Sequence, residues 1–402
     1  MPAVKTRREF LGSLVGAALL AQAESPQQRF DRLMKDILIL DTHIDTPWYM
    51  VDEGYDLGVE HDYYETDIPR LRRGRVGAVF FGIPAQPQDQ PPHLWVERTL
   101  DLIDAVHEAA RKYPQNLEIA YTSDDIRRIS RQGKIAALLS VEGGHQIVDD
   151  LRILRDYYRL GVRYMTLAHF RTNNWADSGT DRAVHNGLSH FGREVVAEMN
   201  RLGMMLDISH VSDKTFYDAV EVSRAPVIAS HSSVRALCDI PRNMNDDMLR
   251  ALAKNGGVIF INFSVAYLDL KAYQTFVGYR DQRDRDIADL MIQQAGNPKK
   301  FGLKRAIQQR YRRMLPPVDF KMVLRHIDHV AKLVGPDHVG LGSDFDGISG
   351  MVPQGLEDVS KFPVLVRGLI ESGYTDADIR KIMGDNLLRV MKRNEEVAGG
   401  RT

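Results

Sequence analysis

The chain has 402 residues, of which 44% are hydrophobic, as expected of a globular protein with a large core. Its 53 basic and 54 acidic residues give a formal net charge of −1, so no overall charge excess indicates binding to nucleic acid or to a membrane surface. The single cysteine, Cys238, excludes an intramolecular disulfide and a cysteine-rich metal site.

The first 23 residues have the order of an export signal. Paired arginines at positions 7 and 8 precede an apolar run at 14–20, and a small-x-small cleavage site follows at 21–23. This order predicts a signal peptide at 1–23, of the twin-arginine type, with a general secretory signal as the alternative. The apolar run is too short to span a bilayer. We therefore expect an exported, periplasmic or extracellular protein without a stable membrane anchor.

Eight short apolar runs follow, and they are rich in Val, Ile and Leu without polar alternation. Such runs are typical of strands that are buried on both faces. Helical patterns lie between many of them, for example one that begins at Asn245 and one that stops at Gly203. The expected strands are 37–40, 76–81, 135–141, 164–167, 204–208, 227–229, 258–261 and 339–341. The expected helices include 97–112, 151–160, 191–202, 245–255 and 320–334.

Eight alternations of strand and helix predict an α/β fold of the (β/α)8 TIM-barrel type, formed by a single domain at 24–402. The alternative is a doubly wound sheet, but no glycine-rich dinucleotide fingerprint follows any of the strands. Two stretches interrupt the rhythm. Proline-rich residues 82–94 indicate a loop, and residues 266–316 form a basic insertion whose apolar residues indicate helices. We interpret this insertion as a solvated flap, with a lid or a subunit contact as the alternative.

Ionisable side chains collect where six of the strands end. Because the carboxyl ends of all strands share one rim of a parallel barrel, these residues are expected to meet. No lysine or arginine accompanies them at the strand ends, so the rim needs a cation, and zinc suits imidazole and carboxylate ligands. The rim residues are His43, Asp45, Glu142, His169, His210, His231 and Asp344.

The other polar residues near the strand ends and the remaining histidines are not expected to bind metal. A lone histidine is usually exposed or hydrogen-bonded, and a strand-end aspartate can simply cap a helix. Asp41 and His145, which stand close to the rim residues in sequence, are expected to orient the ligands through hydrogen bonds. No role is assigned to His61, His93, His107, His185, His190, His326, His329 and His338.

Several long motifs resemble the renal (membrane) dipeptidase family, peptidase family M19. The resemblance covers nearly all of the chain after the signal. The motifs are DTHIDTPW at 41–48, SVEGGH at 140–145, TLAH at 166–169, NNWAD at 173–177, DISHV at 207–211, SHSS at 230–233, GSDFDG at 342–347, GLEDVSK at 355–361 and DNLLRV at 385–390. The resemblance implies an amidohydrolase-like barrel and a dipeptidase with two Zn²⁺ per chain. It also suggests a homodimer, since family members are commonly dimers.

The resemblance further implies the metal ligands. His43 and Asp45 would hold one zinc, His210 and His231 the other, and Glu142 would bridge both. A hydroxide shared by the two ions would then attack the peptide carbon of a dipeptide.

Three residues would serve the substrate. The resemblance implies that His169 contacts the substrate near the reacting carbonyl and helps to stabilise the oxyanion, that Arg242 binds the substrate carboxylate, and that Asp344 is the catalytic acid and base. Two positions depart from mammalian members, with Thr42 and Ile44 in place of Gly and Asn, but neither is a ligand. The insertion at 266–316 is longer than in those members and leaves the substrate preference open.

Two other readings remain. A different binuclear amidohydrolase, such as a lactonase, deaminase or phosphotriesterase, often uses a carboxylated lysine as the metal bridge, whereas no strand-end lysine is present here. A non-catalytic exported binding protein would not need a proton shuttle, and the presence of Asp344 beside a full ligand set speaks against it.

Overall fold

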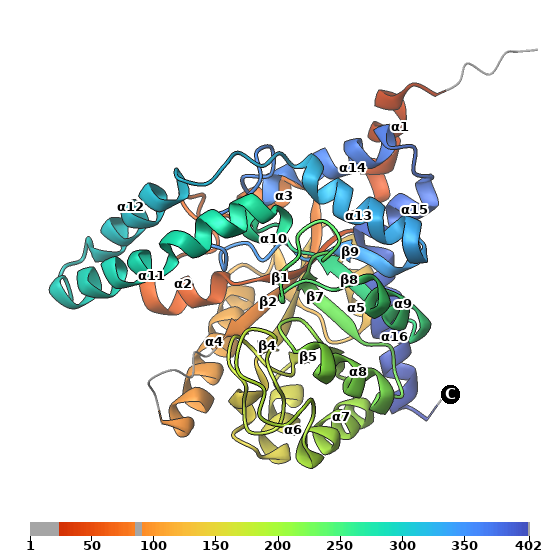
Figure 1. Ribbon diagram of the computed structural model, residues 1–402. Coiled ribbons are helices and arrows are strands. Elements are labelled where there is room, and N and C mark those ends of the chain that lie inside the picture. The colour runs from red at the N-terminus through yellow and green to blue at the C-terminus, as the bar shows by residue number, and fades with distance from the viewer. Residues whose placement is uncertain (1–23, 85–90, 401–402) are drawn as a thin grey trace, which may run out of the picture.

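Residues 24–84 and 91–400 are described by the computed structural model, so the expected signal peptide at 1–23 lies outside the described residues. The centre of the molecule is a barrel of parallel strands with helices packed around it (Figure 1). Its strands run in the order β1 (Ile39–Ile44), β2 (Val76–Pro84), β4 (Ile135–Glu142), β5 (Val162–Thr166), β6 (Met205–Asp207), β7 (Ile228–Ser232), β8 (Val258–Ile261) and β9 (Val339–Leu341). The predicted (β/α)8 barrel is confirmed.

The barrel closes between its first and last strands through the segment that follows β9. Ile44 and Phe345 form a parallel bridge. The backbone N–H of Asp344 donates to the carbonyl of His43 at 3.0 Å, and that of Asp45 donates to Phe345 at 2.9 Å. The residues that complete the ring are therefore the same ones that the sequence places at the rim.

All eight predicted strands are present, although several ends differ. The prediction missed β3 (Leu117–Ile119), a three-residue strand that pairs only with β4. It also ended β1 and β7 too early, because both strands continue through polar residues at the rim. His43 and His231 consequently lie within strands rather than after them.

The helices agree with the expected pattern, including the start at Asn245, whose side chain accepts from the N–H of Met248. Gly203 ends α7 with a φ of 80°, a conformation that favours glycine.

Short turns η1 to η4 span Gly144–Ile147, Pro336–His338, Val359–Lys361 and Lys381–Asp385. The helices are α1 (Pro26–Asp36), α2 (Thr46–Glu53), α3 (Ile68–Arg73), α4 (Pro92–Lys112), α5 (Ser123–Arg131), α6 (Leu151–Arg159), α7 (His190–Leu202), α8 (Asp213–Val222), α9 (Asp246–Lys254), α10 (Val265–Leu268), α11 (Leu270–Gln293), α12 (Lys300–Arg312), α13 (Lys321–Val334), α14 (Phe362–Glu371), α15 (Asp376–Arg380) and α16 (Asn386–Ala398). Among the described residues, none of these helices has the length and apolar character that a membrane span requires.

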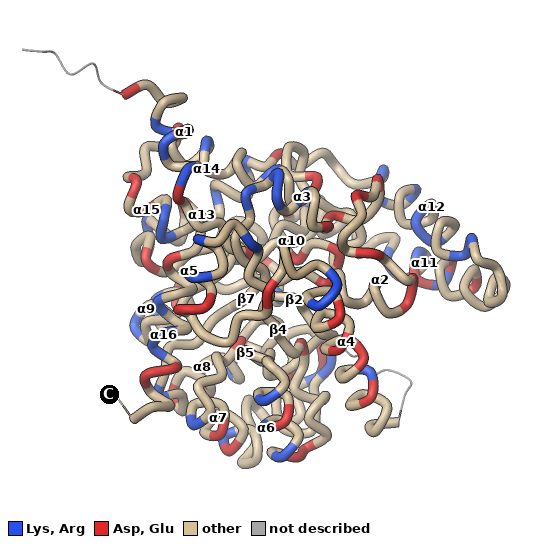
Figure 2. Tube along the Cα trace, turned by 180° about the vertical axis from the view of Figure 1, so that it is seen from behind, with Lys and Arg blue, Asp and Glu red and all other residues tan. Residues whose placement is uncertain are grey.

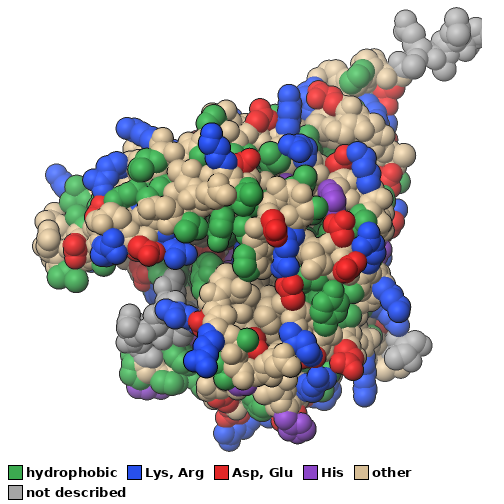
Figure 3. All heavy atoms as spheres, viewed as in Figure 1, with side chains coloured by type: hydrophobic (Ala, Val, Ile, Leu, Met, Phe, Trp, Pro, Cys, Tyr) green, Lys and Arg blue, Asp and Glu red, His purple; other side chains and the backbone are tan. Residues whose placement is uncertain are grey.

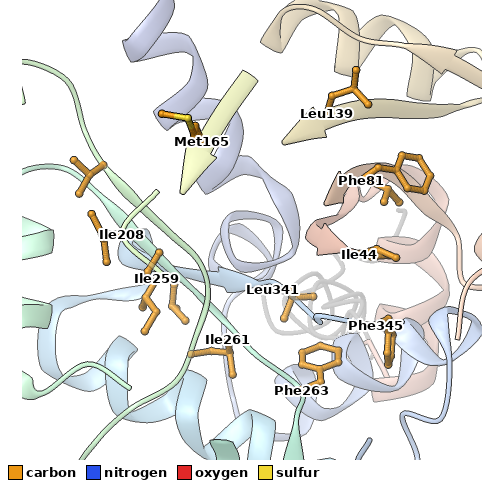
Figure 4. Close-up of a cluster of buried hydrophobic side chains, with 14 of the residues drawn as sticks. Ile44, Phe81, Leu139, Met165, Ile208, Ile259, Ile261, Phe263, Leu341 and Phe345 are labelled. Atoms are coloured by element: carbon orange, nitrogen blue, oxygen red, sulfur yellow. The ribbon is translucent and has the colours of Figure 1, made fainter. Parts of the chain in front are cut away.

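Two hydrophobic clusters use opposite faces of the strands. In β4, Leu139 belongs to a large cluster between the barrel and the helices, part of which is shown in Figure 4. Leu138 belongs to a second cluster, in which Phe80 of β2 and Tyr164 of β5 meet with ring centroids 5.0 Å apart. Because β2 and β5 are not neighbours in the sheet, this second cluster fills the barrel interior. Glu142 has the same strand parity as Leu138 and so continues the interior face at the rim.

The two irregular stretches take different forms. The insertion contains helices α11 and α12, as its apolar residues predict, and the two helices form a hairpin that extends away from the barrel (Figure 1). Basic residues occur along α12, as the blue segments of Figure 2 show. The predicted loop at 82–94 is shorter than expected, because β2 continues to Pro84 and α4 begins at Pro92. Its centre, 85–90, lies outside the described residues.

Candidate metal centre

All seven rim residues that the sequence singled out are buried at the same end of the barrel. His43 and His231 lie in β1 and β7, and Glu142 is the last residue of β4. The others follow the strands directly. None of the seven is more than 8% exposed: His43, Asp45, Glu142, His169, His210, His231 and Asp344.

The Glu142 carboxylate stands at the centre of this group. Its Oε1 lies 3.0 Å from Nε2 of His210 and 3.2 Å from Nε2 of His231. The same oxygen is 3.5 Å from Nε2 of His169 and 3.6 Å from Nε2 of His43. One carboxylate oxygen therefore faces four imidazoles that come from four different strands or strand ends.

Three sets of potential ligands overlap at this point. The first consists of His43, Glu142 and His231, and the second of Glu142, His169 and His210, so Glu142 is shared. Within each set the ligand atoms lie within 4.8 Å of one another. The third set joins His43 to Asp45 and Asp344, with His43 Nε2 3.4 Å from Asp45 Oδ1.

The chemistry of these atoms fits a bound cation. His43 Nε2 and Asp45 Oδ1 are buried without a hydrogen-bond partner, an arrangement that is costly unless another group satisfies them. The Nε2 atoms of His210 and His231 face each other at 2.9 Å. Imidazole nitrogens and carboxylate oxygens are the ligands that zinc takes in hydrolytic sites.

The protonation of the site favours metal binding by two of the histidines. Burial, reinforced by the positive charge of Arg242, lowers the pKa of His210 well below its usual value. Burial and the neighbouring His43 do the same to the pKa of His231. Burial would raise the pKa of Glu142, but the charges of His169 and His43 outweigh it, and the pKa of this carboxyl lies well below normal. Two neutral imidazoles and an ionised carboxylate are therefore ready to coordinate a cation.

Two hydroxyl groups contact the outer nitrogens of ligand candidates. The Tyr164 hydroxyl lies 2.6 Å from Nδ1 of His43 and 2.8 Å from the carbonyl oxygen of Thr42. The Ser230 hydroxyl lies 2.7 Å from Nδ1 of His231, next to it in the chain. No role was predicted for either hydroxyl from the sequence, in which a tyrosine at the start of the expected strand 164–167 was the one available signal.

Asp41 and His145, which were expected to orient the ligands, have the following contacts. Oδ1 of Asp41 accepts from the backbone N–H groups of Ser343 at 2.8 Å and His43 at 3.2 Å, and its Oδ2 accepts from the Ser343 hydroxyl. It thus ties β1 to the segment after β9. His145 lies edge-on to Trp95, with ring centroids 5.3 Å apart.

Asp344 stands beside the ligand set in an unusual conformation. Its φ is +62°, in a region that residues other than glycine rarely adopt. Its Oδ2 accepts a hydrogen bond from the side-chain amide of Asn262 at 2.8 Å. Burial and the nearby charge of Asp45 raise the pKa of Asp344 to about 8. This carboxyl can therefore exchange a proton near neutral pH.

Arg242 is held close to the histidines. Its Nη1 donates to Ser232 Oγ at 2.9 Å and its Nη2 donates to the carbonyl of His231 at 2.8 Å. The guanidinium lies over the ring of Tyr267, 5.5 Å from its centroid, and its buried Nε has no hydrogen-bond partner. The group is thus fixed in place with donor capacity left over.

A cavity of about 940 Å³ opens onto the rim. The hairpin forms part of its wall, and Figure 3 shows basic and hydrophobic side chains along this part of the molecule. The lining includes six of the residues that the sequence selected: Asp45, Glu142, His169, His210, Arg242 and Asp344.

Comparison with known proteins agrees with this geometry. The family model described as membrane dipeptidase (peptidase family M19) matches residues 27–401. An uncharacterized dipeptidase, C965.12 of Schizosaccharomyces pombe, is 38% identical over 401 residues, which cover 94% of this chain and 86% of that protein. Dipeptidase tcpJ of Claviceps purpurea is 37% identical over 365 residues, covering 87% and 76% of the two chains.

A solved structure extends the agreement to three dimensions. The crystal structure of the probable dipeptidase PvdM from Pseudomonas aeruginosa superposes with a TM-score of 0.80 at 29% identity, covering 93% of this chain and 99% of that one. The match of the family model spans nearly the whole chain, and the buried histidine and carboxylate sets supply the metal-site candidates that a metallopeptidase requires. The chain therefore belongs to the membrane dipeptidase family, peptidase family M19, and is a metallo-dipeptidase.

Proposed function

We propose that the enzyme hydrolyses dipeptides with two zinc ions bound at the rim of the barrel. His43 and Asp45 would hold one ion, His210 and His231 would hold the other, and Glu142 would be shared by both. The observation that carries this proposal is the position of Glu142 Oε1, which lies 3.0 Å from Nε2 of His210 and 3.6 Å from Nε2 of His43, one imidazole from each proposed pair. Two dications close together repel each other strongly, so a shared anionic ligand is needed to hold both.

The bound ions would supply a nucleophile at neutral pH, by lowering the pKa of water, and would polarise the peptide carbonyl. The protein contributes the proton transfers. Asp344 accepts a proton from the attacking water and passes it to the leaving amine, a role that its position beside His43 and Asp45 supports. Asn262 holds the carboxyl in place through Oδ2. His169, which also lines the cavity, stabilises the negative charge that develops on the carbonyl oxygen.

Arg242 accounts for the preference for dipeptides. Two of its nitrogens are engaged by Ser232 and His231, which fix the guanidinium at a set position relative to the metal ligands. Each of these nitrogens has a second N–H, and because Arg242 lines the cavity these donors can bind the terminal carboxylate of a substrate. Because the distance from this carboxylate to the scissile bond is then limited, longer peptides do not fit the same grip.

The bridging role is tested with Glu142→Ala. We expect the zinc content of the purified variant, measured by mass spectrometry, to fall from two ions per chain to one or none, and dipeptide hydrolysis to be lost. The matched control is Glu194→Ala, an exposed glutamate on α7, which should keep both properties. Two retained zinc ions in Glu142→Ala would overturn the assignment.

Export and assembly are separate proposals that rest on the sequence alone. Residues 1–23 would direct the folded enzyme through the twin-arginine route, in which case replacing Arg7 and Arg8 by lysine should leave the precursor in the cytoplasm. A homodimer, suggested by the resemblance, can be checked by analytical ultracentrifugation of the mature chain.

A further inference from the structure

The hairpin α11–α12 adds an excess of positive charge to the wall of the active-site cavity. Arg280 and Arg283 of α11 and Lys304 of α12 line the cavity, whereas Asp284 is the one acidic side chain among the lining residues from these helices. The cavity volume of about 940 Å³ is near the upper limit of small-molecule sites, so it leaves room for large substrate side chains.

The neighbouring carboxylates only partly neutralise these cations. Asp284 accepts from Arg283 at 2.8 Å. Glu53 is shared, because its carboxylate lies 3.4 Å from Lys304 Nζ and also accepts from Arg305 at 2.9 Å. One negative charge therefore serves two cations at this position.

Arg280 has its ionic partner on the outer surface. It donates to Asp281, whose side chain is 71% exposed, so solvent screens this pair. We propose that the hairpin selects dipeptides in which one side chain carries a carboxylate. This inference rests on the proposed function, since the substrate must sit between Arg242 and the metal ligands for its side chain to reach the hairpin.

Isosteric substrates test this inference. Wild-type enzyme is assayed with Ala-Glu against Ala-Gln and with Glu-Ala against Gln-Ala. We expect kcat/KM to be roughly tenfold higher for the acidic member of at least one pair, as a charge-assisted contact allows. The double variant Arg280→Gln, Lys304→Gln should reduce this ratio several-fold, and added salt should reduce it in the wild type.

The matched control is Arg285→Gln, which removes an exposed arginine of α11 that bonds to Gln282 and does not line the cavity. The ratio of kcat/KM between acidic and amide substrates should be the same in this variant as in the wild type. Equal cleavage of acidic and amide substrates, or a ratio that the double variant leaves unchanged, would overturn the selectivity while leaving the dipeptidase intact. Failure to cleave any of the four dipeptides would overturn the proposed function as well.

An independent observation concerns the two hydroxyl groups behind the metal ligands. The Tyr164 hydroxyl has one proton, and the Thr42 carbonyl at 2.8 Å can only accept it. Nδ1 of His43, 2.6 Å from the same oxygen, must then be the donor of their hydrogen bond. When this imidazole is neutral, its Nε2 atom consequently has a free lone pair on the side of Glu142 and Asp45.

The Ser230 hydroxyl determines in the same way which ring nitrogen of His231 carries the proton. The Ser230 hydroxyl lies 2.7 Å from the Asp207 carboxylate, a better acceptor than the Ser209 hydroxyl at 3.4 Å. Nδ1 of His231, also at 2.7 Å, must donate to it. We infer that Tyr164 and Ser230 are positioning residues that fix the tautomer of two metal ligands, each with Nε2 free for the ion.

Tyr164→Phe tests this inference, with Tyr157→Phe as the matched control because its buried hydroxyl donates to the Gln146 carbonyl at 2.9 Å. Zinc affinity is measured by competition with a chelator, and the protonated ring nitrogen of His43 is identified by ¹⁵N NMR of metal-free, histidine-labelled protein at a pH where this imidazole is neutral. We expect Nδ1–H in the wild type, mixed tautomers in Tyr164→Phe, and an affinity loss of roughly 10- to 100-fold for that variant alone.

Either of two results would overturn the inference: Nε2–H on His43 in the wild type, or an affinity loss in Tyr164→Phe no larger than in Tyr157→Phe. If the wild type itself bound no zinc, the proposed ligand set would fail with it. The NMR readout on metal-free protein separates the two cases, because it depends on the tautomer and not on the loaded enzyme.

Discussion

Gly82 of β2 lies directly against the carboxylate of Asp45. A Cβ atom at position 82 would stand 2.4 Å from Asp45 Oδ1 and 3.0 Å from His43 Nε2. Both atoms are buried and have no hydrogen-bond partner among the described residues. The absence of a side chain on the neighbouring strand is therefore a condition for the first metal position to exist.

Gly82→Ala should consequently displace Asp45 and His43. We expect the variant to lose the zinc held by these residues and at least tenfold in kcat/KM, without loss of the fold. Zinc stoichiometry and circular dichroism measure the two effects. Gly278→Ala is the control, because a Cβ added there meets no atom within 4 Å. A Gly82→Ala enzyme with two zinc ions and normal activity would contradict this geometry.

Asp344→Asn separates proton transfer from metal binding. Asn keeps the size of the side chain but cannot accept and return a proton, so turnover should fall by roughly 10²- to 10⁴-fold while both zinc ions remain. The measurements are kcat on a dipeptide and the metal content. Normal turnover would remove the acid–base role, and loss of zinc would make Asp344 a ligand instead. Asp289→Asn, an exposed site on α11, serves as the control.

His326 makes stability depend on pH in a predictable direction. Its Nδ1 accepts from the N–H of Val234 at 3.0 Å, and Nε2 donates to the carbonyl of Leu268 at 3.0 Å. Burial lowers the pKa of His326 from 6.5 to about 4. Between these values the unfolded chain binds more protons than the folded one, so the free energy of unfolding falls as pH drops from 6.5 to 4, by roughly 3 kcal/mol.

His326→Gln removes this proton site. In urea unfolding of metal-free protein, the stability difference between wild type and His326→Gln should shrink by roughly 3 kcal/mol between pH 7 and pH 4. The control is His190→Gln, whose side chain is 92% exposed, and its difference from wild type should stay constant. A pH-independent difference for His326→Gln would show that the imidazole does not titrate between the two states.

Metal removal should destabilise the protein, because a ligand that binds only the folded state adds to its stability. Zinc at 100 times its dissociation constant contributes about 2.7 kcal/mol for one site. We expect the Tm to fall on treatment with EDTA and to rise with each addition of zinc. Glu142→Ala should show little of this rise. A Tm that is independent of zinc in the wild type would speak against an ordered metal centre.

Much of the barrel and its rim could be predicted from the sequence. The apolar runs of the strands are continuous in the chain, and the ends of parallel strands share one rim, so local patterns suffice to bring His43, Glu142 and His231 together. The short β3 was missed because a glutamate separates its two apolar residues, so it forms no continuous apolar run. The helices of the insertion were expected, but the sequence left open whether they form a solvated flap, a lid or a subunit contact, and only the structure places them in the cavity wall.

The sequence by itself determined the kind of fold, the family and the set of side chains at the rim, since each depends on residues that are close in the chain or stand at strand ends. Only the tertiary structure decided which of these side chains touch. Tyr164 meets His43 across 121 positions, and Gly82 makes room for Asp45 from another strand. Such contacts depend on the relative register and twist of strands that are far apart in the chain, because a shift of one residue turns each side chain to the opposite face.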